Sequence, residues 1–345
     1  MSPRNEAGNG RPLDPGHEPG AAMALISRAP GCNFSHNVPR AWMLTAGFAV
    51  LLLVAGCGAS TGPANSRIAF VSSRVVTSRG GAVELYVMNA DGTGQRRLTR
   101  NDAIGYLSDY SPFDAAPSWA PDGKWIAYEH DDPAKEKPDI DIVRADGTGR
   151  RVLVRNASFP AWSPKGDLIA FTRERTGGAD VWVIRPDGTG VRVLFHNAAF
   201  SAWSPNGERV AYTRLSGKGA DIYAAKLDGS DELRVTTSPA PDFLPAWSTQ
   251  DEIAFVRQTE TGSDDIYVID ADGTHERRLT RSLAQDTSPA WSPDGSQIAF
   301  SNDLTFTKEW RSGEEIFVIN ADGSGRRRLT HNKVRDIAPS WEPSG

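Results

Sequence analysis

Short apolar segments separated by turn-forming residues recur along the chain from residue 67 onward. Each recurrence begins with a triplet of Ile or Val, then Ala, then Phe or Tyr. A second segment follows in which side chains alternate, as in residues 265–269, which read Asp-Ile-Tyr-Val-Ile. Such period-two alternation is typical of β-strands with one buried face. The triplets lie at residues 68–70, 126–128, 169–171, 210–212, 253–255 and 298–300.

Two further landmarks recur in step with the triplets. The tryptophans of a Trp-Ser-Pro motif or a close variant are Trp119, Trp162, Trp203, Trp247, Trp291 and Trp341, and the aspartates of an Asp-Gly motif are Asp91, Asp146, Asp187, Asp228, Asp272 and Asp322. Pro and Gly favour tight turns at these positions. Each unit is therefore predicted to have four strands: A ends at the Trp, B holds the triplet, C alternates, and D follows Asp-Gly. The tryptophans are 41 to 50 residues apart, which is the size of a propeller blade.

The two ends of the repeat region complement one another. The first unit has strands B, C and D but no Trp strand before Ile68, and the last unit stops just after Trp341. The sequence therefore predicts an all-β fold, a six-bladed β-propeller over residues 67–343. Its ring is closed where the C-terminal A strand joins the N-terminal B, C and D strands, which removes two exposed sheet edges. We expect the Arg-rich D strands, such as residues 326–328, to be solvated edges.

These motifs resemble the PD40, or WD40-like, repeat of TolB-type propellers. The resemblance covers about residues 66–343 and implies the propeller fold, whereas it does not specify a function. TolB proteins carry an additional α/β domain before the propeller. Because only a linker of residues 57–66 precedes the repeats here, we expect that domain to be absent.

The N-terminal region has the features of an export signal. Residues 41–56 form an apolar run behind Arg40, about 15 residues where a stable membrane span needs roughly 20. Residues 54–57 resemble a bacterial lipobox, which implies that Cys57 is the lipid-attachment site of a mature chain anchored by acyl chains. Residues 1–56 are thus interpreted as a signal peptide with a disordered leader. The alternative is an uncleaved anchor; either one places the repeats outside the cytoplasm, in the periplasm or at the cell exterior.

Composition narrows the range of partners. The chain has 38 Lys and Arg against 43 Asp and Glu, a formal net charge of -5, which argues against a nucleic-acid partner. Both cysteines, Cys32 and Cys57, precede the repeats, so no disulfide supports the fold. We find no motif for a cofactor, a metal site or catalytic residues, and we expect none of these.

One face of the propeller is predicted to vary. The A–B and C–D turns share one face and have uniform lengths, whereas the B–C and D–A loops share the opposite face, which we call the loop face. Insertions on the loop face carry aromatic residues that are candidate contact anchors: Tyr106, Tyr110, Phe113, Phe306 and Trp310. The alternative is that these loops pack only on their own blades.

A second candidate site is a set of acidic residues on the A strands. Five residues before the Trp stand Asp114, Asp242, Asp286 and Asp336, while the equivalent positions hold Ala157 and Ala198. Because strand A is innermost in a propeller, these aspartates are expected around the channel mouth on the loop face. There they would bind a cation or a basic segment of a partner. The local alternative is that each Asp makes an Asx-type turn into its own strand.

The absence of a catalytic constellation favours a binding module over an enzyme. The first hypothesis is a lipid-anchored extracytoplasmic scaffold that binds an envelope protein or a peptidoglycan-associated partner through the loop face. The alternative is a carbohydrate-binding or carbohydrate-active propeller, similar to a lyase or glycosidase, that uses the acidic residues at the channel mouth.

Overall fold

The computed structural model describes residues 66–77, 80–101, 113–132, 134–216, 219–259, 262–281, 284–303, 313–332 and 334–344. All regular secondary structure in these ranges is β-strand, which confirms the all-β prediction. In these ranges, accordingly, no helix has the length and apolarity to cross a membrane. The predicted signal peptide, the lipobox and Cys57 lie outside the described residues.

The strands pair into four-stranded antiparallel ladders, which we number I to VI. Ladder I contains β24 (Asp336–Trp341), β1 (Arg67–Thr77), β2 (Gly80–Asn89) and β3 (Arg96–Arg97); ladder II contains β4 (Phe113–Trp119), β5 (Trp125–Asp131), β6 (Asp139–Arg144) and β7 (Arg151–Val154); ladder III contains β8 (Ser158–Trp162), β9 (Ile169–Arg175), β10 (Gly178–Ile184) and β11 (Arg192–Phe195). Ladder IV contains β12 (Ala198–Trp203), β13 (Arg209–Ser216), β14 (Gly219–Lys226) and β15 (Leu233–Arg234); ladder V contains β16 (Asp242–Trp247), β17 (Glu252–Gln258), β18 (Asp264–Asp270) and β19 (Arg277–Arg278); ladder VI contains β20 (Asp286–Trp291), β21 (Gln297–Asp303), β22 (Glu314–Asn320) and β23 (Arg327–Arg328). A single parallel bridge between Val83 and Phe113 links ladders I and II.

The last strand of the chain pairs with the first. Trp341 in β24 lies opposite Ile68 in β1, in an antiparallel register. The next residue, Glu342, donates its backbone N–H to the Arg67 carbonyl and accepts a bond from the Arg67 side chain. The indole N–H of Trp119 in ladder II donates to the Ser340 carbonyl in β24 at 3.1 Å. The C-terminal strand is therefore bound on both sides, by β1 and by the next ladder.

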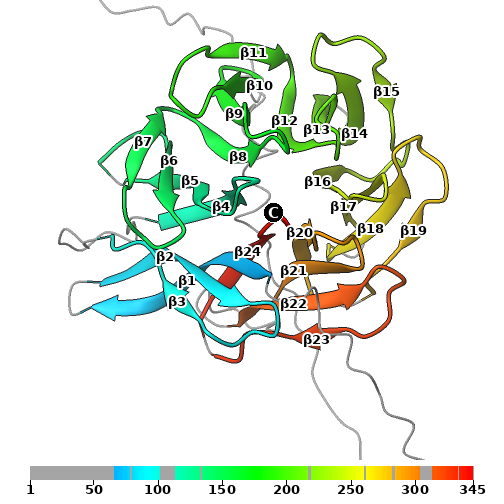
Figure 1. Cartoon of the computed structure of the whole chain (residues 1–345). Helices are drawn as coiled ribbons and strands as arrows, with labels where there is room; N and C mark the ends of the chain where they lie inside the picture. Colours follow the sequence, from blue (N-terminus) through cyan, green and yellow to red (C-terminus); the bar gives the residue numbers. More distant parts are fainter. Residues whose placement is uncertain are drawn as a thin grey trace, which may run out of the picture.

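The ladders stand side by side around a common centre, as Figure 1 shows. The first strands β4, β8, β16, β20 and β24 lie nearest that centre, and the short fourth strands β3, β7, β11, β15, β19 and β23 lie at the rim. The Asp-Gly turns lie between the third and fourth strands. In the turn of ladder V, Asp272 Oδ1 accepts the Thr274 backbone N–H at 2.9 Å, as expected for an Asx-type turn.

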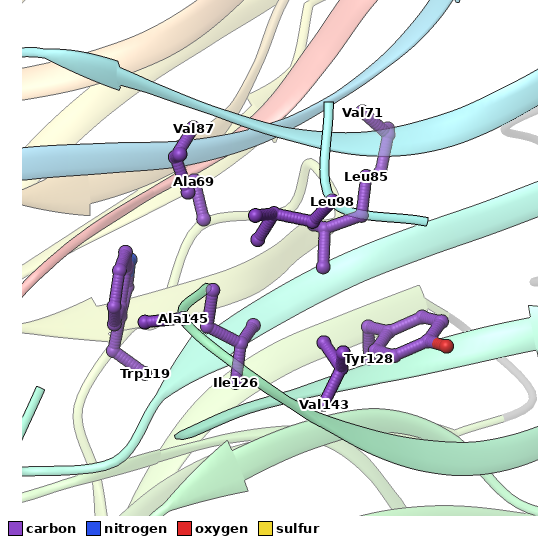
Figure 2. Packing of buried hydrophobic residues seen from close by; sticks show 10 residues of the cluster. All are labelled: Ala69, Val71, Leu85, Val87, Leu98, Trp119, Ile126, Tyr128, Val143 and Ala145. Carbon is purple, nitrogen blue, oxygen red and sulfur yellow. The ribbon is translucent and has the colours of Figure 1, made fainter. Parts of the chain in front are cut away.

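The core consists of apolar layers between neighbouring ladders. Figure 2 shows one layer, in which Leu85 and Leu98 of ladder I face Ile126 and Tyr128 of ladder II. An equivalent layer joins ladder VI to ladder I and includes Trp341. The first strand of each ladder carries one residue other than glycine with positive φ, between 44° and 55°: Ala116, Phe159, Phe200, Leu244, Ser288 and Ala338. These β-bulges bend the innermost strands.

The fourth strands are less solvated than the sequence predicts. Within residues 326–328, Arg328 pairs with the buried Glu315 carboxylate of β22, and Arg327 donates to the Ala90 carbonyl of ladder I at 3.2 Å. The prediction of a simply solvated edge was wrong because these side chains fold back onto acceptors in their own and neighbouring ladders. Their charges are used in contacts within the propeller.

Candidate binding site on the loop face

Each ladder holds an arginine over an aromatic side chain of its second strand, and in every ladder except II this arginine also lies over an aromatic side chain of the third strand. The guanidinium carbon lies 4.4 to 5.9 Å from the ring centroids, within the range of cation–π contacts. We call these the stack arginines: Arg74, Arg150, Arg173, Arg214, Arg257 and Arg326. Four come from the second strand of their ladder, while Arg150 and Arg326 come from the segment before the fourth strand. The repeat motifs of the sequence do not predict this arrangement.

The predicted acidic residues lie beside these arginines. Asp242 receives two bonds from Arg257, at 2.6 Å from Nε and 2.8 Å from Nη2. Asp336 pairs with Arg74, Asp286 lies 3.4 Å from Arg326, and Asp114 lies 2.9 Å from His130. The carboxylates bond across the ladder, which differs from the Asx-type turn considered from the sequence.

Burial decides what these four aspartates can do. Each is 0% exposed, so none reaches a partner in bulk solvent from this conformation. Their role in the described structure is to neutralise cations and to hold the loop ends of the first strands. A carbohydrate-active site would need accessible acids, and these carboxylates are all engaged. Among the described residues, no group of three or more His, Cys, Asp or Glu could hold a metal ion.

The predicted aromatic anchors are described only in part. Phe113 begins β4 and is 36% exposed, so its ring is available to a partner at the loop face. Tyr106, Tyr110, Phe306 and Trp310 lie outside the described residues.

Two cavities lie on the loop face. The larger, of about 570 Å³, lies between the β5–β6 connection and ladder III and is lined by Glu136, Lys137, Arg155, Asn156, Arg173 and Glu174. The smaller, of about 360 Å³, lies beside the β13–β14 hairpin and is lined in part by Arg214, Tyr223 and Arg234. Each contains a stack arginine, so the cation–π stacks reach the surface at this face. The feature of the sequence that points to the larger cavity is Ala157, which stands at a position where four other ladders have an aspartate.

Glu129 is a buried acid at the seam between ladders II and III. Its Oε2 accepts the backbone N–H of Phe159, one of the positive-φ residues, at 3.2 Å. Hydroxyl groups make the same bond at other seams, from Phe200 to Thr172 and from Ala338 to Ser301. The pKa of Glu129 is raised to about 7, mainly by burial; the Phe159 N–H lowers it, and the neighbouring Asp131 and Glu174 raise it.

Glu129→Gln is expected to stabilise the protein at alkaline pH. Above its usual pKa near 4.5 the unfolded chain ionises Glu129 while the folded carboxyl stays protonated, so the wild-type protein loses stability as pH rises towards 7. That loss is about 3 kcal/mol when complete. Urea unfolding should therefore show equal stabilities at pH 4 and a more stable variant at pH 8. The exposed Glu136→Gln is the control; a wild-type advantage at pH 8 would contradict the prediction.

The comparisons with known proteins agree with this fold. A family model described as the TolB beta propeller domain, PD40, matches residues 199–308. A curated relative, the "Tol-Pal system protein TolB" of Desulfosudis oleivorans, is 29% identical over 119 residues, which are 34% of this chain. The match spans only 24% of that relative's length.

Solved structures extend the likeness over most of the chain. TolB from Acinetobacter baumannii superposes with a TM-score of 0.67 at 20% identity, covering 81% of this chain and 67% of that one. A putative TolB from Agrobacterium tumefaciens gives a TM-score of 0.59 at 20% identity, covering 79% and 90% respectively. At these identities the superpositions show the fold alone. Together with the sequence matches, they show that the chain has a β-propeller fold like that of TolB, with a PD40 match over residues 199–308.

Proposed function

We propose that this protein is an exported, lipid-anchored binding protein that engages an envelope protein or a peptidoglycan-associated partner through its loop face. The observation that carries the proposal is the concentration of cavities and partly exposed cation–π stacks on that face. The name of the Desulfosudis relative places that protein in the Tol-Pal system, which supports an envelope role here as a hypothesis. Aromatic and arginine side chains are also the residue types that most often dominate protein–protein binding energy.

The membrane attachment belongs to the same proposal. Cys57 follows an apolar run and a basic flank, and about ten residues separate it from the first strand of the propeller. A flexible linker of that length has a root-mean-square span of roughly 15–20 Å. A diacylated Cys57 would therefore keep the propeller close to the membrane and within reach of envelope partners.

A closed ring of six blades is part of the proposal because it fixes the loop face as one continuous surface. Pairing of β24 with β1 supports it, as does the apolar layer between ladders VI and I. Gly92 in the ladder I turn lies so close to ladder VI that an added Cβ would be 2.5 Å from the Leu329 carbonyl oxygen. In such a ring, ladders VI, I and II are neighbours.

A capture experiment tests the proposed function. The full chain, with a C-terminal affinity tag, would be expressed in a bacterial host and used to capture cross-linked envelope proteins. Replacing residues 102–112 with a short Gly-Ser linker should remove the principal captured protein. The control is Lys165→Glu, an exposed change at an A–B turn on the opposite face, which should leave capture unchanged. Unchanged capture after the loop replacement, or loss in both variants, would contradict the loop-face assignment.

A further inference from the structure

The stack arginines can be compared at equivalent positions in neighbouring ladders. In ladder V, Arg257 lies opposite Asp242 of the first strand and also pairs with Glu276. Glu276 stands two residues before Arg278, which is the residue of β19 that lies opposite Tyr267. In ladder IV, Arg214 lies opposite Ala198, which has no carboxylate. Arg214 pairs with Glu232, which stands at the position equivalent to Glu276. In ladders IV and V the stack arginine therefore draws its carboxylate from the outer segment or from both the first strand and the outer segment. Arg150 of ladder II differs, because it pairs with Asp141 of the third strand.

In ladder III neither position supplies a carboxylate. Ser158 pairs with Thr172, which puts Ala157 next in register beside Arg173, and Val191 stands at the outer position. Arg173 still stacks, 5.4 Å from the Phe171 centroid and 4.8 Å from that of Trp182. Its Nε and Nη2 donate to the carbonyls of Asn156 and Arg155 at 3.1 and 3.0 Å.

Ladder III therefore keeps the cation without its anion. The ion pairs found within the described ranges include none for Arg173, while Arg74, Arg150, Arg214, Arg257 and Arg326 each pair with an acid. Burial alone lowers the pKa of Arg173, whereas neighbouring carboxylates raise the pKa values of Arg214 and Arg257. The guanidinium is thus partly desolvated and lacks the counter-charge that every other ladder supplies.

The larger cavity of the loop face opens at this place. Arg173, Arg155 and Lys137 line it together with Glu136 and Glu174, so its wall carries one more cation than anions. Its volume of about 570 Å³ admits a side chain or a short peptide segment. Two rings hold the Arg173 guanidinium flat, and two of its N–H groups already donate to backbone carbonyls. A ligand carboxylate would bind the remaining N–H groups, because a guanidinium suits a carboxylate.

We propose that the cavity beside Arg173 binds a carboxylate of an acidic peptide segment of a partner protein, which would supply the counter-charge that Asp242 supplies to Arg257 in ladder V. The choice of a partner protein as the source of the carboxylate rests on the proposed function. The preference of the site for a carboxylate rests on the contacts of Arg173 alone. The small excess of positive charge suits one or two carboxylates at a time. The ligand would complete the charge pairing of ladder III in trans.

The substitution Ala157→Asp tests this directly, because it supplies in cis the carboxylate that the ligand would provide. The probes are a capped tetra-glutamate peptide, its tetra-glutamine counterpart and free glutarate, measured by isothermal titration against the propeller. The wild-type protein should bind tetra-glutamate at least tenfold more tightly than tetra-glutamine or glutarate. Ala157→Asp should weaken tetra-glutamate binding at least tenfold. The matched control Ala198→Asp, beside the already paired Arg214, should change it less than twofold.

Arg173→Gln is the second variant, needed if Ala157→Asp does not fold, and it should also lose at least tenfold in tetra-glutamate binding. Equal binding of tetra-glutamate by the wild type and both ladder III variants would overturn the site. Glutarate binding as tightly as tetra-glutamate would overturn the assignment to a peptide. The two proposals fail separately: loss of tetra-glutamate binding in Ala157→Asp supports this site even if replacing residues 102–112 leaves envelope capture unchanged.

Discussion

Replacing Trp341 with alanine is expected to lower the free energy of unfolding by about 3 kcal/mol, although only four residues follow it in the sequence. Trp341 is 6% exposed and packs with Ile68 and Phe70 of β1 in the layer between ladders VI and I. Its removal leaves a cavity at the pairing of β24 with β1, and the truncated side chain cannot refill it. Urea unfolding of the propeller, followed by far-UV circular dichroism, measures the loss.

Trp291→Ala is the matched comparison, because Trp291 ends the first strand of ladder VI and the chain continues from it into the second strand of the same ladder. Its indole N–H donates to the Ala246 carbonyl of ladder V at 3.1 Å, while that of Trp341 finds no acceptor among the described residues. Trp291→Ala should therefore cost about 1 kcal/mol more than Trp341→Ala. If Trp341→Ala costs less than about 1 kcal/mol, β24 is not part of the cooperative fold and the closed ring is wrong.

The strands were the most predictable part of the fold because their signals are local. A triplet such as residues 253–255 combines β-branched and aromatic residues, and the Trp of the turn motif before it stands at a nearly constant distance. The bulges of the first strands were not predictable. Ala338 has φ 53°, a conformation that its side chain does not favour, and only the bond from its N–H to Ser301 of the neighbouring ladder shows what holds it.

The candidate site shows the same division between local and long-range signals. The four aspartates lie on the first strands and are buried, and their proposed role in binding stays a prediction. Asp242 meets Arg257 only when β16 and β17 pair in the observed register, and the sequence separates the two by 15 residues. The stack arginines were missed for the same reason. The aromatic anchors at residues 102–112 and 304–312 stay predictions.

Asp242→Ala is expected to destabilise the protein by about 3 kcal/mol, because it leaves the Arg257 guanidinium buried and deprived of two of its bonds. The Arg257 side chain is 10% exposed, and the remaining partner Glu276 lies at the outer end of the stack. Arg173 in ladder III tolerates the equivalent arrangement because it reaches solvent through its cavity and bonds to two carbonyls. Urea unfolding at pH 7 measures the difference.

The double substitution Asp242→Ala with Arg257→Met is the control that separates lost charge pairing from lost packing. Burial raises the pKa of Asp242 more than Arg257 lowers it, so desolvation of the carboxylate offsets much of what the pair gains. An unbranched methionine over the rings of Phe255 and Tyr267 would restore contacts without a buried charge. The double variant should therefore lie within about 1 kcal/mol of the wild type. A double variant as unstable as Asp242→Ala alone would show that the aspartate contributes by packing, and the charge comparison that singles out Arg173 would lose its energetic basis.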